Sequence, residues 1–139
     1  MIEPADDKRA ITILDEDYPA AFLSLSDPPF VFFYKGDLNL LKKQCVGIVG
    51  SRRVSEYSLK ATKTIAKALS LKYVIVSGMA KGIDRLAHLE AIHSGSIGIL
   101  GSGIDYIYPY ANKDLYELMA NKGLLISEYP DHTIPYAKH

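Results

Sequence analysis

The chain has 139 residues, of which 48% are hydrophobic and 23% are charged, and its formal net charge is zero. This length and composition suit one folded domain with a hydrophobic core and exclude a disordered chain. No apolar run approaches the roughly 20 residues of a membrane span, and the polar, acidic N-terminus excludes a secretory signal. The single cysteine, Cys45, excludes an internal disulfide and a cysteine-based metal site. We therefore expect a soluble, cytoplasmic protein without membrane contact.

The charges are distributed unevenly along the chain. Residues 1–41 contain three basic and eight acidic side chains, whereas residues 42–90 contain ten basic and three acidic ones. The local field matters more to binding than the net charge does, so the basic middle third favours an anionic partner. Its lysines also fit a simpler interpretation, the solvated outer face of a helix.

The first 40 residues are predicted to form an N-terminal extension, and residues 41–139 to form the main domain. Residues 1–29 contain several turn-forming pairs and are typical of an arm, and residues 30–34 are typical of a short strand. From Cys45 onward, apolar runs alternate with segments of helical periodicity. Strands are predicted at 45–50, 72–78, 96–103 and 124–127, and helices at 56–70, at about 84–93 and from Asn112 to Gly123.

The first of these apolar runs is typical of a strand that is covered on both faces. In the helix that follows, Ser55 can cap the start. The apolar stripe of this helix is expected to comprise Tyr57, Ala61, Ile65 and Ala68. Asn112 can cap the last helix, and Gly123 can end it. The alternation of strands and helices with short links predicts an α/β fold with a doubly wound, mainly parallel sheet.

Glycine-rich turns follow the first two predicted strands, and each turn contains a cation. The first strand ends in GSRR, residues 50–53, and the second in SGMAKG, residues 77–82. In an open α/β sheet such turns lie at the edge where ligands bind. Backbone N–H groups, a following helix N-terminus and the side chains of Arg52 and Lys81 all favour an anion there. Either turn alone is common, but the pair predicts an anion-binding site.

The sequence narrows the class of anion. It contains no GxxxxGK[ST] motif of the kind that binds nucleoside triphosphates. The third strand ends in Gly101-Ser102-Gly103, but the dinucleotide-binding fingerprint is incomplete, because Tyr106 stands where a third glycine is needed. A mononucleotide or a phosphodiester backbone remains.

Catalysis and metal binding receive little support. Asp84 and His88 are four residues apart and could form an acid–base pair, although a structural hydrogen bond is the more common arrangement. His88 and His93 are five residues apart and do not share a helix face as metal ligands would. Asp105 and Glu128 are the best-placed carboxylates, but either can simply cap or salt-bridge a loop. We predict no catalytic residue, no metal and no cofactor.

Three tyrosines alternate in the segment IDYIYPYAN, residues 104–112. On a loop beside a basic cleft, Tyr106, Tyr108 and Tyr110 could stack nucleic-acid bases. Such rings more often pack beneath their loop with the hydroxyl at the surface.

Four blocks of the sequence resemble, in order, the signature motifs of the DprA/Smf family (DNA-processing protein A). They are VGIVGSRRVSEYS, IVSGMAKGIDRLAH, GILGSGIDYIYPYAN and LLISEYPDHTIP. The resemblance also covers the lead-in YPAAFLSLSDPPFVFFYKGDLNLL, so it extends from about residue 17 to the end. It implies a Rossmann-like fold and binding of single-stranded DNA without marked sequence preference. It further implies loading of the RecA recombinase onto DNA during natural transformation, without enzymatic activity.

The resemblance also implies roles for individual residues. Arg52 and Lys81 match the basic residues of the two family turns and are expected to contact DNA phosphates. The residues expected to form the nucleic-acid-binding site are Gly50, Ser51, Arg52, Ser77, Gly78, Lys81 and Gly82. Those expected to support this site or to be structural are Asp84, His88, Gly101, Gly103 and Asp105.

The family pattern continues beyond this sequence with an FPxRNR block and further strands, so the Rossmann-like domain at 41–139 is expected to be incomplete at its C-terminus. A homodimer is a further possibility that the resemblance raises. Two other classes stay open. One is a nucleotide-binding or nucleoside-monophosphate phosphoribohydrolase-like protein, which usually carries a PGGxGTxxE-type motif that this sequence lacks. The other is an interaction module whose basic surface is incidental.

Overall fold

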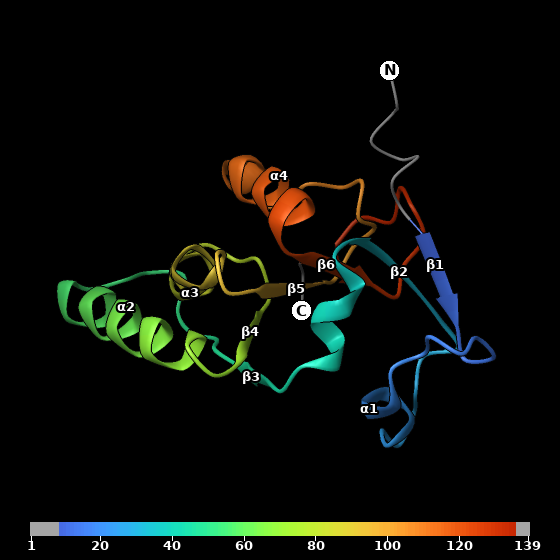
Figure 1. Ribbon diagram of the computed structural model, residues 1–139. Helices are drawn as coiled ribbons and strands as arrows, with labels where there is room; N and C mark the ends of the chain where they lie inside the picture. The colour runs from blue at the N-terminus through green and yellow to red at the C-terminus, as the bar shows by residue number, and fades with distance from the viewer. Residues whose placement is uncertain (1–8, 136–139) are drawn as a thin grey trace.

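The computed structural model describes residues 9–135, in which strands and helices are arranged around one sheet (Figure 1). The outer limits of the two predicted domains, residues 1 and 139, lie outside the described residues. Between residues 9 and 135, none of the helices has the length and apolar character needed to cross a membrane. In chain order, the elements are β1 (Arg9–Thr12), α1 (Ala20–Leu23), β2 (Val31–Gly36), η2 (Leu38–Lys42), β3 (Cys45–Gly47), α2 (Glu56–Ser70), β4 (Val74–Ser77), α3 (Ile83–Ala91), β5 (Ser96–Leu100), η3 (Tyr110–Asn112), α4 (Lys113–Lys122) and β6 (Leu124–Ser127).

The strands form a six-stranded sheet in the order β1-β2-β6-β5-β4-β3. β3, β4, β5 and β6 pair in parallel, whereas β2 pairs antiparallel with both β6 and β1. The predicted α/β class with a mainly parallel sheet is confirmed.

Two strands of the sheet come from the segment predicted as an N-terminal extension. β2 matches the strand predicted at 30–34, whereas sequence analysis missed β1. β1 pairs with β2 along its whole length, and β2 in turn pairs with β6. This segment is therefore integrated into the main sheet, and the proposed division of the chain at residue 40 stays a prediction.

The strand order sets the layers of the fold. From β3 to β6, each parallel strand lies beside its predecessor, so right-handed crossovers place α2, α3 and α4 on one face of the sheet. Figure 1 shows these three helices on one side of the sheet, with η2 and α1 on the other. Side chains alternate between the faces of a strand. In β6, Leu125 packs with Leu115 and Met119 of α4. Its neighbour Ile126 packs in the core around Phe32 on the other face.

β3 is the last strand on its side of the described sheet. Its residues Cys45 and Gly47 are exposed, and Val46 is half-buried. The prediction of a strand covered on both faces is therefore wrong. β3 pairs only with β4 and has three residues, and an apolar run alone does not reveal whether a strand is central or at an edge.

The buried face of α2 differs from the predicted one. Tyr57 and Ile65 are 82% and 53% exposed, so the apolar stripe expected on this helix is wrong. The buried residues of α2 are Thr62, Ala66 and Ser70. Ala66 packs with Ala87 and Ala91 of α3 and is fully buried. Small side chains let the two helices approach closely, and this packing decides the orientation of α2 more than the hydrophobicity of its larger residues does.

The helix ends are partly as predicted. Ser55 caps α2 through a capping box, in which its side chain accepts from the Ser58 N–H at 3.1 Å and the Ser58 side chain accepts from the Ser55 N–H at 2.9 Å. Gly123 ends α4, as expected. Asn112 stands at the N-cap position of α4 but makes no capping hydrogen bond, so that prediction is wrong. Its side chain serves another contact, described below.

The buried face of α2 can be tested by two substitutions. We expect Ala66→Leu to lower the free energy of unfolding by about 1–3 kcal/mol, because the larger side chain does not fit between α2 and α3. Ile65→Ala, at the exposed neighbouring position, should change it by about 0.5 kcal/mol or less. Urea denaturation measures both values. If Ile65→Ala lowered the free energy of unfolding more than Ala66→Leu, the face predicted from the sequence would be the buried one.

Candidate functional site

A cavity of about 620 Å³ lies where the carboxyl ends of β3, β4 and β5 meet. This is the edge of an open α/β sheet at which ligands bind. The residues that line the cavity are Arg52, Arg53, Gly78, Ala80, Lys81, Leu100, Gly101, Ser102, Tyr108, Pro109, Tyr116, Tyr129 and Pro135. They come from the ends of these strands and the turns that follow them, together with the loop before α4, α4 itself and the segment after β6.

Three cations line this cavity. Arg52 and Arg53 come from the turn after β3, and Lys81 comes from the turn after β4. All three are exposed, and none forms an ion pair with another of the residues 9–135. The cavity lining includes no carboxylate. The positive charges are therefore uncompensated, which favours an anionic ligand.

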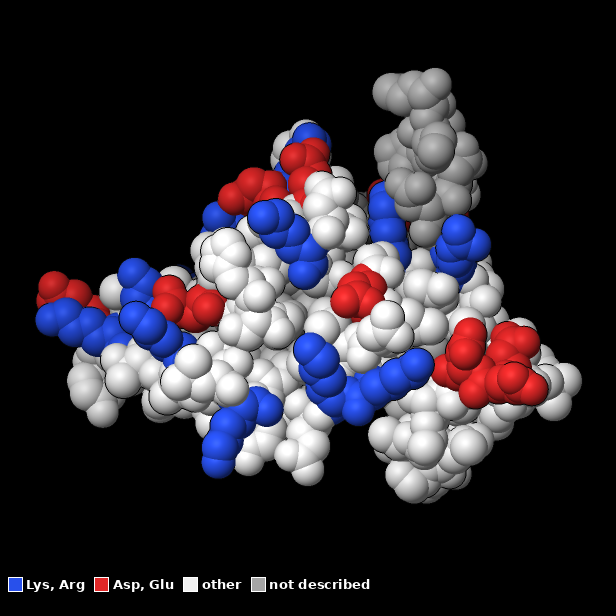
Figure 2. Space-filling model, viewed as in Figure 1, with Lys and Arg blue, Asp and Glu red and all other residues white. Residues whose placement is uncertain are grey.

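A second cavity, of about 640 Å³, has a different electrostatic character. It lies between the segment before α1 and η2, and its lining combines Glu16 and Asp17 with Lys42 and Lys43. On the surface seen in Figure 2, acidic side chains form a patch beside β1 and α1, and basic side chains lie along α2. Because opposite charges balance in the second cavity, the cavity at the carboxyl ends of the strands is the better anion site.

The two glycine-rich turns are locked together through their backbones. The N–H of Ile83 donates to the carbonyl oxygen of Ser51 at 3.1 Å. Gly82 adopts a φ of 81°, and a Cβ at this position would overlap the carbonyl oxygens of Ser51 and Arg52. Only glycine combines this left-handed conformation with so close an approach. This contact holds the turn that bears Arg52 beside the turn that bears Lys81.

The carboxylate of Asp84 organises the second turn from within. Its Oδ2 accepts hydrogen bonds from the N–H groups of Gly78 at 3.1 Å and Ala80 at 3.3 Å. Asp84 is only 6% exposed and lies in the first turn of α3, where the helix dipole favours a negative charge. It does not line the cavity. The expected supporting role of Asp84 thus has a concrete form, although whether it serves a ligand stays a prediction.

Asn112 also holds this turn. Its Nδ2 donates to the carbonyl of Met79 at 2.9 Å, and its Oδ1 accepts from Nη1 of Arg85 at 3.0 Å. Met79 has a φ of 68°, which is unusual for a residue with a side chain. Arg85 also forms a bidentate pair with Asp114, and this hydrogen bonding lowers the pKa of Asp114 to about 2. The first turns of α3 and α4 are therefore tied to the strained residue of the loop.

His88 supports the sheet rather than the cavity. It is fully buried, and its Nδ1 lies 2.6 Å from the Ser96 hydroxyl, which itself donates to the carbonyl of Ile75. The Ser96 hydroxyl has one proton to give, so Nδ1 of His88 carries the proton of their shared bond. Burial lowers the pKa of His88 to about 4, although the nearby Asp84 opposes this effect. No hydrogen bond joins Asp84 and His88, so they do not form an acid–base pair in this structure.

The other predicted site residues divide into two groups. Gly78, Gly101, Arg52 and Lys81 line the cavity. Gly50, Ser51, Ser77 and Gly82 do not line it but support the turns around it. The Ser51 hydroxyl accepts from the Arg53 N–H at 3.0 Å, and the buried Ser77 hydroxyl donates to the carbonyl of Ile48. A Cβ on Gly50 would press against Ile83, so this glycine lets the first turn pack on α3.

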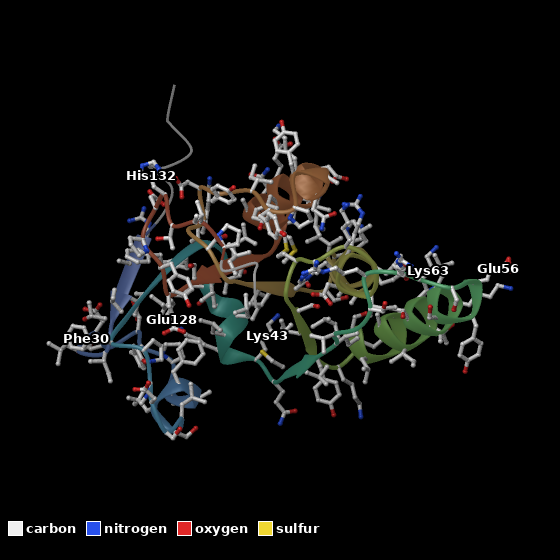
Figure 3. All side chains as sticks on the ribbon, turned by 180° about the vertical axis from the view of Figure 1, so that it is seen from behind. Phe30, Lys43, Glu56, Lys63, Glu128 and His132 are labelled. Carbon is white, nitrogen blue, oxygen red and sulfur yellow. The ribbon has the colours of Figure 1, made fainter. Side chains whose placement is uncertain are left out.

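Gly103 and Asp105 fasten the segment that follows β6. The N–H of Gly103 donates to the carbonyl of Thr133 at 3.0 Å. The carboxylate of Asp105 accepts from the His132 N–H at 2.8 Å and contacts its ring Nδ1 at 2.9 Å. Figure 3 shows His132 on the β1 side of the molecule, far from α2. Both residues therefore act as structural clamps, and neither lines the cavity.

Sequence analysis missed part of the cavity wall. It did not assign a contact to Arg53, whose adjacency to Arg52 was the available signal. Of the three alternating tyrosines, all are at least 38% exposed, but only Tyr108 lines the cavity. Tyr129 follows the predicted strand at 124–127 within a motif of the family resemblance, and this position was the available signal, whereas Tyr116 lies in no quoted motif. Among residues 9–135, no group of three His, Cys, Asp or Glu side chains is placed to hold a metal ion.

Comparison with known proteins gives a consistent family assignment. The sequence model of DNA recombination-mediator protein A matches residues 9–139. The chain belongs to this family. It is 41% identical to the DNA processing protein DprA of Streptococcus pneumoniae, over 94% of this chain and 47% of that protein. It is 39% identical to DprA of Bacillus subtilis, over 93% and 45%. The predicted DprA/Smf resemblance is confirmed, and the chain spans about half the length of these relatives.

Solved structures of the family have the same fold. The X-ray structure of DprA from S. pneumoniae superimposes with a TM-score of 0.88 at 40% identity, covering 94% of this chain and 47% of that one. DprA from Helicobacter pylori gives a TM-score of 0.83 at 36% identity, covering 94% and 60%. The H. pylori structure is described as giving insight into a single-stranded DNA binding mode of that protein.

The lock between the two turns can be tested at Gly82. We expect Gly82→Ala to lower the free energy of unfolding by about 2 kcal/mol or more, because a Cβ would overlap Ser51 and impose strain at a positive φ. Gly101→Ala is the matched control, since a Cβ there would meet nothing within 4 Å. Urea denaturation of both variants distinguishes them. Equal effects would mean that the two turns are not locked through Gly82.

The buried His88 should make stability depend on pH. Its pKa is lowered in the folded state, so on acidification the unfolded chain takes up the proton first and the folded state loses stability. Between pH 7 and pH 5 this histidine should cost about 2 kcal/mol of unfolding free energy. His88→Asn keeps a donor for Ser96 but does not titrate, so its stability should fall less over this range. The same substitution at the exposed His93 should leave the wild-type pH dependence unchanged.

Proposed function

We propose that this protein binds the phosphodiester backbone of single-stranded DNA in the cavity at the carboxyl ends of β3–β5. The observation that supports this most directly is the set of unpaired cations, Arg52, Arg53 and Lys81, on the wall of one cavity. Phosphate contacts of this kind carry most of the affinity of proteins that bind nucleic acid without sequence preference. The single-stranded DNA binding mode described for the H. pylori relative supports the same ligand.

The aromatic residues of the cavity favour a single strand over a duplex. Tyr108 and Tyr129 are 39% and 44% exposed and line the same cavity as the cations. Proteins that bind single-stranded nucleic acid combine a positive groove with exposed aromatic rings, because unpaired bases can stack on these rings. In a duplex the base faces are already stacked and do not reach such rings.

We infer a binding protein rather than an enzyme. The candidate acid and base groups are engaged in structural hydrogen bonds: Asp84 with backbone N–H groups, His88 with Ser96, and Asp105 with His132. None of the three lines the cavity. The family relationship further supports delivery of bound DNA to the RecA recombinase in the cytoplasm, and a homodimer as the working form. These are proposals for the whole protein, since this chain spans about half of its relatives.

Binding can be measured by fluorescence anisotropy with labelled oligo(dT) at low and moderate salt. We expect wild-type protein to bind, with an affinity that falls as salt rises. Arg52→Ala combined with Lys81→Ala should weaken binding by at least about tenfold and reduce the steepness of log affinity against log salt by about 1.4, since two phosphate contacts to a single strand are lost.

A control variant separates the cavity from general charge effects. Lys63 projects outward from α2 (Figure 3), and Lys67 is also exposed on this helix. Lys63→Ala combined with Lys67→Ala removes the same two charges outside the cavity and should change the affinity by less than about threefold. Equal losses in both double variants would contradict a localised site. Absence of binding at low salt in the wild type would contradict the proposed function for this chain.

A further inference from the structure

The backbone donors of the second turn are already occupied by an anion of the protein itself. In glycine-rich phosphate sites, successive N–H groups of such a turn point at the phosphate of the ligand. Here Gly78 and Ala80 line the cavity, but their N–H groups donate to Oδ2 of Asp84. The place that a phosphate would take in a backbone nest is filled by a carboxylate.

This carboxylate is fixed in its position. Asp84 is 6% exposed and belongs to α3, whose start is locked to the first turn through Ile83 and Gly82. A Cβ on Gly78 would lie only 3.0 Å from Oδ2 of Asp84, which shows how closely the turn wraps around it. A ligand that used these N–H groups would have to break both hydrogen bonds to Asp84.

Terminal phosphates and internal phosphodiesters differ in the charge that they bring to this cavity. A terminal phosphate monoester carries about −1.5 to −2 charges near pH 7, whereas each phosphodiester carries about −1. The cavity wall carries the cations Arg52, Arg53 and Lys81. The buried carboxylate of Asp84 is bonded to the N–H groups of Gly78 and Ala80 in the same wall. Attraction by the three cations and repulsion by Asp84 both grow with the charge of the ligand. The N–H groups of Gly78 and Ala80 are already bonded to Asp84, so they give a doubly charged phosphate no additional donors.

We propose that Asp84 determines the ligand specificity of the site. It makes the cavity select the internal phosphodiesters of a nucleic-acid strand and reject terminal phosphates and mononucleotides. This inference rests on the proposed function, because it describes how the same cavity distinguishes a DNA backbone from other phosphates. It also explains why a glycine-rich turn in a Rossmann-like sheet need not bind a nucleotide.

The test compares two competitors that differ by one terminal phosphate. The dinucleotides TpT and pTpT displace labelled oligo(dT) from the full chain, and anisotropy measures the concentration each requires. In the wild type, pTpT should compete no better than TpT within about twofold, and thymidine 5′-monophosphate should compete less well than either. In Asp84→Asn, which keeps an acceptor for both N–H groups but removes the charge, pTpT should gain at least about threefold over TpT.

Glu90→Gln is the matched control. It removes one negative charge from the same helix at a position that does not line the cavity, so the ratio between pTpT and TpT should stay at its wild-type value. The proposal is overturned if pTpT competes more than about twofold better than TpT in the wild type, because the terminal phosphate would then be preferred. It is equally overturned if Asp84→Asn leaves the ratio unchanged.

A second measurement does not depend on DNA binding. In Asp84→Ala the N–H groups of Gly78 and Ala80 lose their internal anion, so inorganic phosphate should raise the Tm of this variant by at least about 2 °C more than that of the wild type. If oligo(dT) binds to neither protein but this difference appears, the proposed function fails while the internal anion is upheld. If oligo(dT) binds and the difference is absent, the function stands and the role of Asp84 fails. Should Asp84→Ala not fold, the competition in the wild type and in Asp84→Asn still decides.

Discussion

The candidate site depends on one backbone contact, between the turn after β3 and the turn after β4. The Ile83 N–H donates to the Ser51 carbonyl, and Gly82 comes so close to the same oxygen that no side chain is possible there. Through this contact, two segments separated by a strand and a helix become one wall, with Arg52 on one part and Lys81 on the other. Three like charges in one cavity repel each other, so a rigid backbone is needed to keep their side chains together.

α3 connects this wall to the rest of the fold. Within its first two turns, Asp84 binds the loop N–H groups, Arg85 binds Asn112 and Asp114 near the start of α4, and His88 reaches Ser96 on β5. Asp84 and His88 lie on one face of the helix and Arg85 lies on another, so a single nine-residue helix contacts the turn, the neighbouring helix and the neighbouring strand. A shift of α3 would therefore move the cation from the second turn and the loop before α4 together.

The sequence predicted the parts of the site better than their orientation. Alternating apolar runs and glycine-rich turns were sufficient to place Arg52 and Lys81 at one edge of a parallel sheet. The direction of polar groups was not predictable in the same way. The Ser77 hydroxyl donates to the carbonyl of Ile48, and the Asn112 amide donates to the carbonyl of Met79. In each pair the donor and acceptor are far apart in sequence, so packing determines which groups meet. The buried face of α2 was predicted wrongly for the same reason. The small Ala66 determines this face only through its contact with α3, which the sequence of α2 does not show.

The polar groups around the cavity fall into two classes, and this division determines how a ligand is recognised. The buried ones, such as Asp84, Ser77 and Asn112, are paired within the protein, as burial requires. The cations Arg52 and Lys81 are exposed, and neither has a partner within residues 9–135. Recognition therefore falls on flexible charged side chains rather than on preorganised backbone donors. Such contacts tolerate variation in sequence and geometry along a strand and weaken with salt, which is consistent with the proposed binding of single-stranded DNA without sequence preference.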